Sequence, residues 1–319
     1  MNFNKTGVII AHEYSIRVRK KSFILTTLLT PLLMGLMICL PIFITGSGPN
    51  DMAGVSPSMD IGEAGGTSST VCMAVSYMMS FLIYIFVFTF GTMVMRGVID
   101  EKSSRVVEVI VSSVKPFELM MGKILGVALV ALTQFIIWIA LTTAVVAVVI
   151  GNLASELLPG VEVFSAEDLQ ALGELQSLNW GYMIVCFLIY FVLGYLLYAS
   201  MFAAIGASVD NDSDTQQLQL PVTFPLIVGI FIMLHTFEHP DSQLSFWASI
   251  IPYTSPMVML ARLPFSGVPF WQLSLSIVLL VAAFIGTAYL SARIYRVGIL
   301  LYGRKSTPAD LWKWLKQKN

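Results

Sequence analysis

The sequence carries, from Glu101 to Lys123, the stretch EKSSRVVEVIVSSVKPFELMMGK. This stretch mixes charges of both signs with an apolar stripe, and long apolar runs lie on both sides of it. A run of about 20 apolar residues is long enough to cross a membrane as a helix. The stretch therefore predicts a polar, helix-forming island that connects two membrane spans, and the rest of the chain is arranged around it.

The composition is that of a membrane protein. Only 12% of the 319 residues are charged and 56% are hydrophobic, whereas a soluble domain carries about 25% charged residues. Three cysteines, Cys39, Cys72 and Cys186, lie in apolar runs at unrelated spacings, which indicates buried thiols and speaks against a disulfide framework or a zinc site. We expect no cleavable signal peptide, because the first apolar run begins only near Phe23 and is long and interrupted by proline.

Six apolar runs are candidates for membrane spans. They cover residues 23–45, 71–95, 124–150, 180–206, 220–237 and 271–292. The fifth run is short and has Pro221 and Pro225 near its start. None of the six contains Lys, Arg, Asp or Glu, and ionisable side chains inside spans are what usually mark proton relays. The sequence thus predicts an all-α integral membrane protein and speaks against a proton-coupled pump.

Lysine and arginine are distributed unevenly among the connecting segments. Residues 1–22 and 96–123 hold five each, the segment from Arg293 onward holds seven, residues 238–270 hold one, and residues 46–70, 151–179 and 207–219 hold none. Basic segments stay in the cytoplasm. We therefore predict a multi-pass protein of the inner (cytoplasmic) cell membrane, with both termini and the second and fourth connections in the cytoplasm and with residues 296–319 as a basic cytoplasmic tail.

Three of the flanking segments predict short helices. Residues 1–22 have a rough apolar side and basic residues at their end, which favours an amphipathic helix on the inner membrane surface over a frayed, solvated terminus. Ser165 and Asp168 form a capping-box pattern before an amphipathic stretch on the outer side. Residues 246–270 are apolar but contain four prolines, which predicts a re-entrant pair of short helices between spans five and six, with Arg262 reaching the outer interface.

The island itself splits at Pro116, which favours a new helix start there. Before it, Glu101 and Arg105 form a favourable i,i+4 pair, and Arg105 and Glu108 form an i,i+3 pair, each worth only a few tenths of a kcal/mol. We interpret the island either as a helix lying on lipid headgroups or as a docking element for a cytoplasmic partner. The acidic fourth connection, which anionic lipid would repel, favours the partner, although a plain solvated turn also fits it.

Several kinds of chemistry have no motif in the chain. The only Gly-Lys pair, Gly122–Lys123, is followed by isoleucine, so a P-loop for ATP is missing. His235 and His239 are four residues apart, but they do not form the H-E-x-x-H pattern and they abut Pro240. A metal site and an intramembrane enzyme are therefore both disfavoured. The spacing of Gly122 and Gly126 allows close helix approach, although such a match is common.

Three stretches carry a resemblance to a known family. They are RGVIDEKSSRVVEVIVSSVKPFELMMGKILGVALVALTQF (Arg96–Phe135), GASVDNDSDTQQLQLPVTFP (Gly206–Pro225) and HEYSIRVRKKSFILTTLLTP (His12–Pro31). Together they resemble permease subunits of the type-two ABC exporters, in the sodium-exporter-like branch. Members of this branch often carry a sizeable extracytoplasmic domain between the first two spans, where this chain has only residues 46–70. The chain is then either a compact member or one that has lost the domain.

The resemblance implies a fold and a set of partners. It implies six spans, an N-terminal interfacial helix, re-entrant helices, a coupling helix over Glu101–Ser113, pairing with a second permease as a homodimer or heterodimer, and two ATPase subunits that bind ATP and Mg²⁺. It also implies a partner-coupling role for Glu101, Lys102, Arg105, Glu108, Val109, Asp210, Asp214, Thr215 and Gln216.

The leading hypothesis is thus an ATP-driven exporter permease with no cofactor of its own and no nucleic-acid partner. Its cavity wall would be apolar, with aromatic and methionine side chains, which suits an amphipathic cargo better than a bare ion. The alternative is a non-transporting membrane scaffold or sensor that docks the same ATPase partner.

Overall fold

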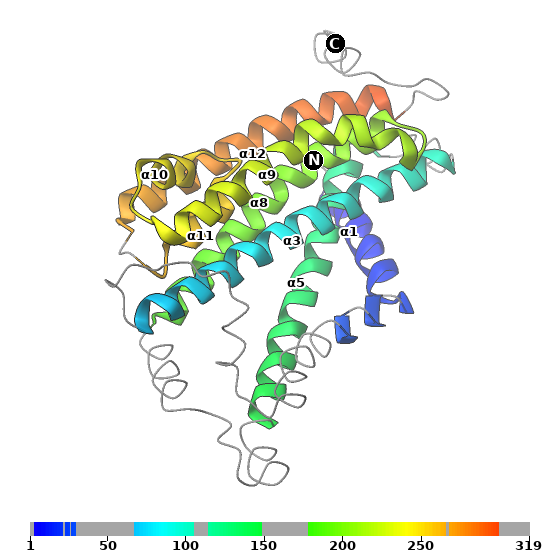
Figure 1. The fold of residues 1–319 in the computed structure, drawn as a ribbon. Coiled ribbons are helices and arrows are strands. Elements are labelled where there is room, and N and C mark those ends of the chain that lie inside the picture. The colour runs from blue at the N-terminus through cyan, green and yellow to red at the C-terminus, as the bar shows by residue number, and fades with distance from the viewer. Residues whose placement is uncertain are drawn as a thin grey trace. The chain divides into compact units, whose positions relative to one another are not determined.

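The structure is a computed structural model that describes residues 3–21, 23–25, 27–29, 67–104, 114–148, 178–265 and 268–299. Helices make up the regular structure of these residues, and no strand occurs among them (Figure 1). The elements are α1 (Phe3–Val18), α3 (Thr67–Ser103), α5 (Pro116–Val148), α8 (Trp180–Ser208), η3 (Asp212–Asp214), α9 (Thr215–Glu238), α10 (Gln243–Ile250), α11 (Ser255–Arg262) and α12 (Phe270–Gly298). The expected all-α class is thus found over the described part of the chain.

Five described helices are long and apolar enough to cross a membrane, and each lies over a predicted span. They are α3, α5, α8, α9 and α12. The first predicted span, residues 23–45, and the capped helix expected near Ser165 lie mostly or wholly outside the described residues. The expected division into an interfacial helix, six spans and a tail stays a prediction.

Two helices run further into the island than hydropathy predicts. α3 continues through Arg96 to Ser103 instead of ending at residue 95, and α5 begins at Pro116 instead of residue 124. The helix start expected at Pro116 is confirmed. Hydropathy falls at the first charged side chain, but the backbone N–H and C=O groups of a helix pair with each other whether the side chains are apolar or charged. Residues 105–113, most of the predicted coupling helix, lie outside the described residues.

The chain divides into two compact units. The first unit comprises Met1–Tyr14, Met73–Leu129 and Trp180–Asn319, and the second comprises Ser15–Cys72 and Val130–Asn179. Within the second unit, the indole N–H of Trp138 donates to the carbonyl oxygen of Thr27 at 3.1 Å. The first unit holds the ion pairs and the aromatic core described below.

Helix α8 forms the centre of the first unit. Its aromatic side chains from Phe187 onward are almost fully buried, and the ring of Phe191 lies 5.5 Å from that of Phe86 on α3. Two tyrosines tie α8 to neighbouring elements, because the Tyr195 hydroxyl donates to the carbonyl oxygen of Ile124 at 2.8 Å and the Tyr198 hydroxyl donates to that of Tyr253 at 2.7 Å. Buried polar groups are thereby paired inside an apolar interior.

Helix α9 is continuous even though Pro221 and Pro225 lie inside it. A proline inside a helix removes one hydrogen bond and costs about 3 kcal/mol, so packing has to hold this segment helical. One face of α9 supplies that packing through buried side chains such as Leu226 and Met233. The opposite face exposes large apolar groups, including Phe224 and Phe231, as suits a helix in contact with lipid.

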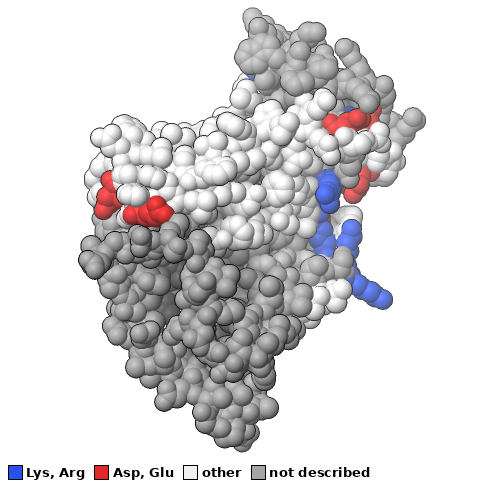
Figure 2. Space-filling model, viewed as in Figure 1, with Lys and Arg blue, Asp and Glu red and all other residues white. Residues whose placement is uncertain are grey.

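The described surface over the long helices is that expected of a protein embedded in a membrane. Figure 2 shows that the described surface over the long helices is largely without Lys, Arg, Asp or Glu, which gather near helix ends. Wide apolar surface of this kind is rare on a soluble monomer.

Gly206→Ala is expected to destabilise the fold. The added Cβ would lie 2.5 Å from the carbonyl oxygen of Met95, so α8 and α3 would have to separate, and overpacking of this kind costs about 1–3 kcal/mol. Gly286→Ala in α12 is the matched control, because its Cβ would meet nothing within 4 Å. We expect a lower thermal midpoint in detergent for the first variant only, and equal midpoints would contradict the close contact of α3 with α8.

Candidate functional site

Two lysines are buried where α3 ends and α5 begins. Lys102 and Lys123 are each only 1% exposed. Burial of an unpaired ammonium group would cost several kcal/mol, so each must be matched by acceptors from the protein. The matching carboxylates are Glu13, Glu101 and Asp210, and we call these five residues the charged junction.

Lys123 has an acceptor for each of its three ammonium protons. Its Nζ lies 2.9 Å from Oε1 of Glu13, 2.6 Å from Oε1 of Glu101 and 3.2 Å from the carbonyl oxygen of Gly97. These acceptors come from α1 and α3, while Lys123 itself is on α5. A single side chain therefore fixes the relative positions of three helices.

Lys102 makes the corresponding connection to the end of α8. Its Nζ donates to the carbonyl oxygen of Ala207 at 2.9 Å and lies 2.9 Å from Oδ1 of Asp210. The carbonyl of Ala207 is one of the last in α8, where the helix leaves acceptors without intrahelical partners. A cation at this position also interacts favourably with the helix dipole.

Glycines allow the backbones at the junction to approach closely. A Cβ on Gly122 would lie 2.6 Å from the side chain of Ile9, and a Cβ on Gly126 would lie 2.6 Å from Cβ of Glu13. On the other side, a Cβ on Gly298 would lie 2.7 Å from the carbonyl oxygen of Ala207. The two glycines noted in the sequence thus allow α1 to pack closely against α5, and this packing places Glu13 beside Lys123.

The predicted coupling residues fall into three groups. Glu101, Lys102 and Asp210 come together in the charged junction. Asp214 precedes α9 and Thr215 is buried in its first turn, whereas Gln216 is exposed beside them. Arg105, Glu108 and Val109 lie outside the described residues, as does the predicted pairing of Arg105 with Glu101. The partner-coupling role of all nine residues stays a prediction.

Sequence reasoning missed two members of the junction. The sequence predicts Glu13 on a helix at the membrane surface, and it predicts Lys123 only as one of the basic residues of a cytoplasmic connection. Lys123 stands directly after Gly122 and three residues before Gly126, so the glycine pair was the signal available. The sequence does not show that α1 is the segment that fills the space beside these glycines.

A second buried polar cluster lies at the opposite end of α9. Arg262 is 5% exposed, its Nε donates to the carbonyl oxygen of Pro240 at 2.7 Å, and its Nη1 donates to Oγ of Ser249 at 3.1 Å. The hydroxyl of Ser249 also accepts from the amide of Gln272 at 2.8 Å. We call these buried residues, Arg262, Ser249 and Gln272, the arginine network; the Asp241 carboxylate beside it is exposed.

The arginine network shows that Arg262 is bound within the protein, whereas its expected place at the outer lipid interface stays a prediction. Acceptors inside the protein bind its guanidinium group, and the carboxylate of Asp241 lies 3.6 Å away. Burial lowers the pKa of the Arg262 guanidinium and the Asp241 charge opposes that change, so the group stays charged. Two short helices, α10 and α11, do occupy the segment predicted to be re-entrant; their depth in a membrane stays a prediction.

Comparison with known proteins identifies the family. Residues 73–293 match the family described as ABC-2 family transporter protein. The chain is 33% identical over 230 residues to the uncharacterized protein YhaP of Bacillus subtilis (strain 168), which covers 72% of this chain and 52% of that protein. It is 26% identical over 227 residues to the uncharacterized protein MJ1024 of Methanocaldococcus jannaschii, with 71% and 50% covered. No solved structure matches the chain significantly.

The chain belongs to the ABC-2 transporter family. Together with its apolar helices, this membership makes it a multi-pass membrane protein of the permease type. The chain spans about half the length of the curated relatives that it matches. The sodium-exporter-like branch stays a prediction.

Lys123→Met is expected to lower the free energy of unfolding by about 3–5 kcal/mol, because two carboxylates would then face each other in a buried site. Lys115→Met is the control, since Lys115 is exposed. Thermal midpoints of the purified chains in detergent measure the difference. Adding Glu13→Gln and Glu101→Gln to Lys123→Met is expected to recover part of the loss. Equal stability of the two single variants would show that the junction does not need its ammonium group.

Arg262→Lys is expected to destabilise the α10–α11 region. An ammonium group cannot donate to the carbonyl oxygen of Pro240 and the hydroxyl of Ser249 with the planar geometry of the guanidinium group. A buried acceptor left unpaired costs about 1–3 kcal/mol. Hydrogen exchange of residues 240–262 should rise in this variant. Arg296→Lys, at an exposed position in α12, should leave exchange unchanged; the same result for Arg262→Lys would argue against the network.

Proposed function

We propose that the chain is the permease subunit of an ATP-driven exporter and that separate ATPase subunits drive it. ATP and Mg²⁺ would be bound by those subunits, because the chain has no P-loop motif. The proposal places the protein in the inner cell membrane with both termini in the cytoplasm, in contact with lipid and paired with a second permease copy. Membership of the ABC-2 family supports it.

The observation that carries the proposal is the pairing of Glu101 with Lys123 at 2.6 Å. Glu101 lies in the last turn of α3, and Lys123 lies in the second turn of α5. Residues 104–115, which include most of the predicted coupling segment, connect these two helix ends. A force applied to the connection would therefore move α3 and α5 together and would not merely bend the connection between them.

The same junction would transmit the force to other helices. Lys102 binds the end of α8 and Asp210, and Glu13 connects α1. In this proposal Lys102 and Asp210 act as positioning residues, because Lys102 is buried, while the segment 105–113 contacts the ATPase. The acidic segment that begins at Asp210 would then form the second contact.

Reversal of both charges in the coupling segment, Arg105→Glu with Glu108→Arg, tests the proposal. The chain purified from its native membranes with its cognate ABC ATPase should lose bound ATPase activity by about tenfold or more, because misplaced interface charges cost several kcal/mol. The thermal midpoint of the permease should not change. Glu238→Arg, at the other end of α9, serves as the control and should retain the ATPase.

Full retention of the ATPase by the doubly reversed chain would contradict this coupling route. Reconstitution of the permease and ATPase in vesicles separates the two remaining functions. ATP-dependent movement of an amphipathic cargo supports the exporter, whereas ATP hydrolysis without cargo movement favours the scaffold or sensor.

A further inference from the structure

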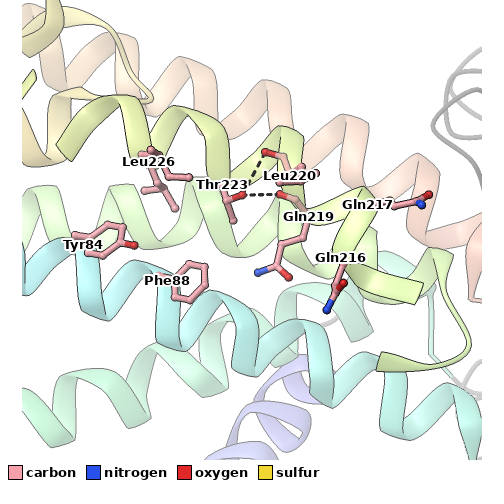
Figure 3. Close-up of a pocket in the computed structure, with 9 residues that line it drawn as sticks. Tyr84, Phe88, Gln216, Gln217, Gln219, Leu220, Thr223 and Leu226 are labelled. Atoms are coloured by element: carbon pink, nitrogen blue, oxygen red, sulfur yellow. Dashed lines mark hydrogen bonds between the residues drawn. The ribbon is translucent and has the colours of Figure 1, made fainter. Parts of the chain in front are cut away.

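A pocket of about 540 Å³ lies between α3 and α9 in the first unit. Tyr84 and Phe88 of α3 form one wall, and α9 supplies the other through Gln216, Gln219, Thr223 and further side chains (Figure 3). Its volume lies within the range of about 300–1,000 Å³ that is usual for small-molecule sites. We call this site the glutamine pocket.

The wall from α3 is an aromatic surface that continues beyond the pocket. The rings of Tyr84 and Phe88 lie 6.2 Å apart and nearly parallel, at 15°. Phe81 lies 6.1 Å from Tyr84, and Tyr77 lies 5.5 Å from Phe81. These four residues occupy one face of α3, since they are spaced by four, three and four positions. The pocket therefore opens onto a row of rings against which a planar apolar group can pack.

The wall from α9 is polar but uncharged. Figure 3 shows Gln216 and Gln219 directed toward α3, whereas Gln217 points away. The Thr223 hydroxyl donates to the carbonyl oxygens of Gln219 and Leu220 at 3.1 and 3.2 Å, so it is occupied within its own helix. Each glutamine amide offers both donors and an acceptor. The pocket can thus bind a hydrogen-bonding group of either kind.

Among the described residues, those that line the pocket carry no carboxylate, ammonium or guanidinium group. A charged ligand group would lose water on entry and gain no counter-charge from the lining. An uncharged group loses far less and is compensated by the amides. The chemistry of the two walls therefore selects for a neutral head attached to an apolar, ring-containing body.

We propose that the glutamine pocket binds an uncharged aromatic amphiphile, with its rings against Tyr84 and Phe88 and its neutral polar head at Gln216 and Gln219. That this ligand is the exported cargo rests on the proposed function; the binding itself does not. The site would account for recognition of the cargo by the permease before any ATPase acts.

The test is photo-crosslinking of the full chain in lipid nanodiscs without an ATPase. The probe is a benzophenone linked by an amide to a dihydroxypropyl head, and its matched analogues carry trimethylammonium or sulfonate heads. We expect saturable labelling of α3 and α9 peptides by the neutral probe, competed by a non-photoreactive diphenylmethane analogue. Labelling should be weaker for both charged analogues.

Tyr84→Ala and Phe88→Ala are each expected to reduce the saturable labelling by about tenfold, because each removes a ring from the apolar wall. Phe88→Tyr should retain the labelling. Because Phe88 also contacts Phe202, the thermal midpoint of each variant is measured, and Tyr84→Ala provides the second, independent removal. Phe231→Ala is the control, since Phe231 is 67% exposed on α9 and does not line the pocket.

Replacement of Gln216 and Gln219 together by leucine should abolish the preference for the dihydroxypropyl head over an alkyl head. Unchanged labelling of folded Tyr84→Ala, or equal pocket labelling by the charged analogues, would overturn the proposal. Specific labelling without ATP-dependent transport in vesicles would refute the exporter and leave the binding site intact, so the two failures are distinguishable.

Discussion

The fold of the first unit depends on giving a buried lysine all the acceptors that it needs. Lys123 is 1% exposed, and water cannot replace any acceptor that the protein fails to supply. Glu13, Glu101 and the carbonyl of Gly97 meet this requirement only when α1, α3 and α5 hold one particular arrangement. A buried ion pair adds little net stability compared with an apolar packing of the same size, but it strongly penalises alternatives. The charged junction is therefore better understood as a device for specificity than as a source of stability.

The two buried polar clusters lie in different parts of the first unit and hold different helices together. The charged junction holds the ends of α3 and α8 and the start of α5, whereas the arginine network holds α10, α11 and the start of α12 around Ser249. Between them, α8 packs through aromatic rings, whose contacts tolerate small displacements better than hydrogen bonds to a buried charge do. A unit with rigid ends and an apolar middle is suited to moving as one body. This property fits the proposed permease, which would be moved from one side.

Hydropathy was enough to predict five of the described long helices, because each has to place about 20 apolar residues in lipid. It failed at the end of α3 and at the start of α5, where charged residues continue the helix. The sequence predicts a partner-coupling role for Lys102 and a place at the outer interface for Arg262, and the structure shows that both side chains are buried. Whether a basic side chain is buried depends on acceptors from distant segments, such as Asp210 for Lys102, and no local pattern reveals those. The glycine spacing at Gly122 was visible, but its partner helix was not.

The docking of α1 also has a consequence for the order of biosynthesis. Glu13 and Lys123 are 110 positions apart, so the ribosome completes α1 long before the surface that receives it exists. Until α5 has been inserted, the Glu13 carboxylate has no ammonium group to meet and must stay hydrated. Helix α1 thus joins the membrane body late although it is made early, and its arrival completes the coordination of Lys123. The N-terminal helix can therefore complete its contacts only after the chain has been made as far as Gly126, when both glycines of α5 and Lys123 are available to receive it.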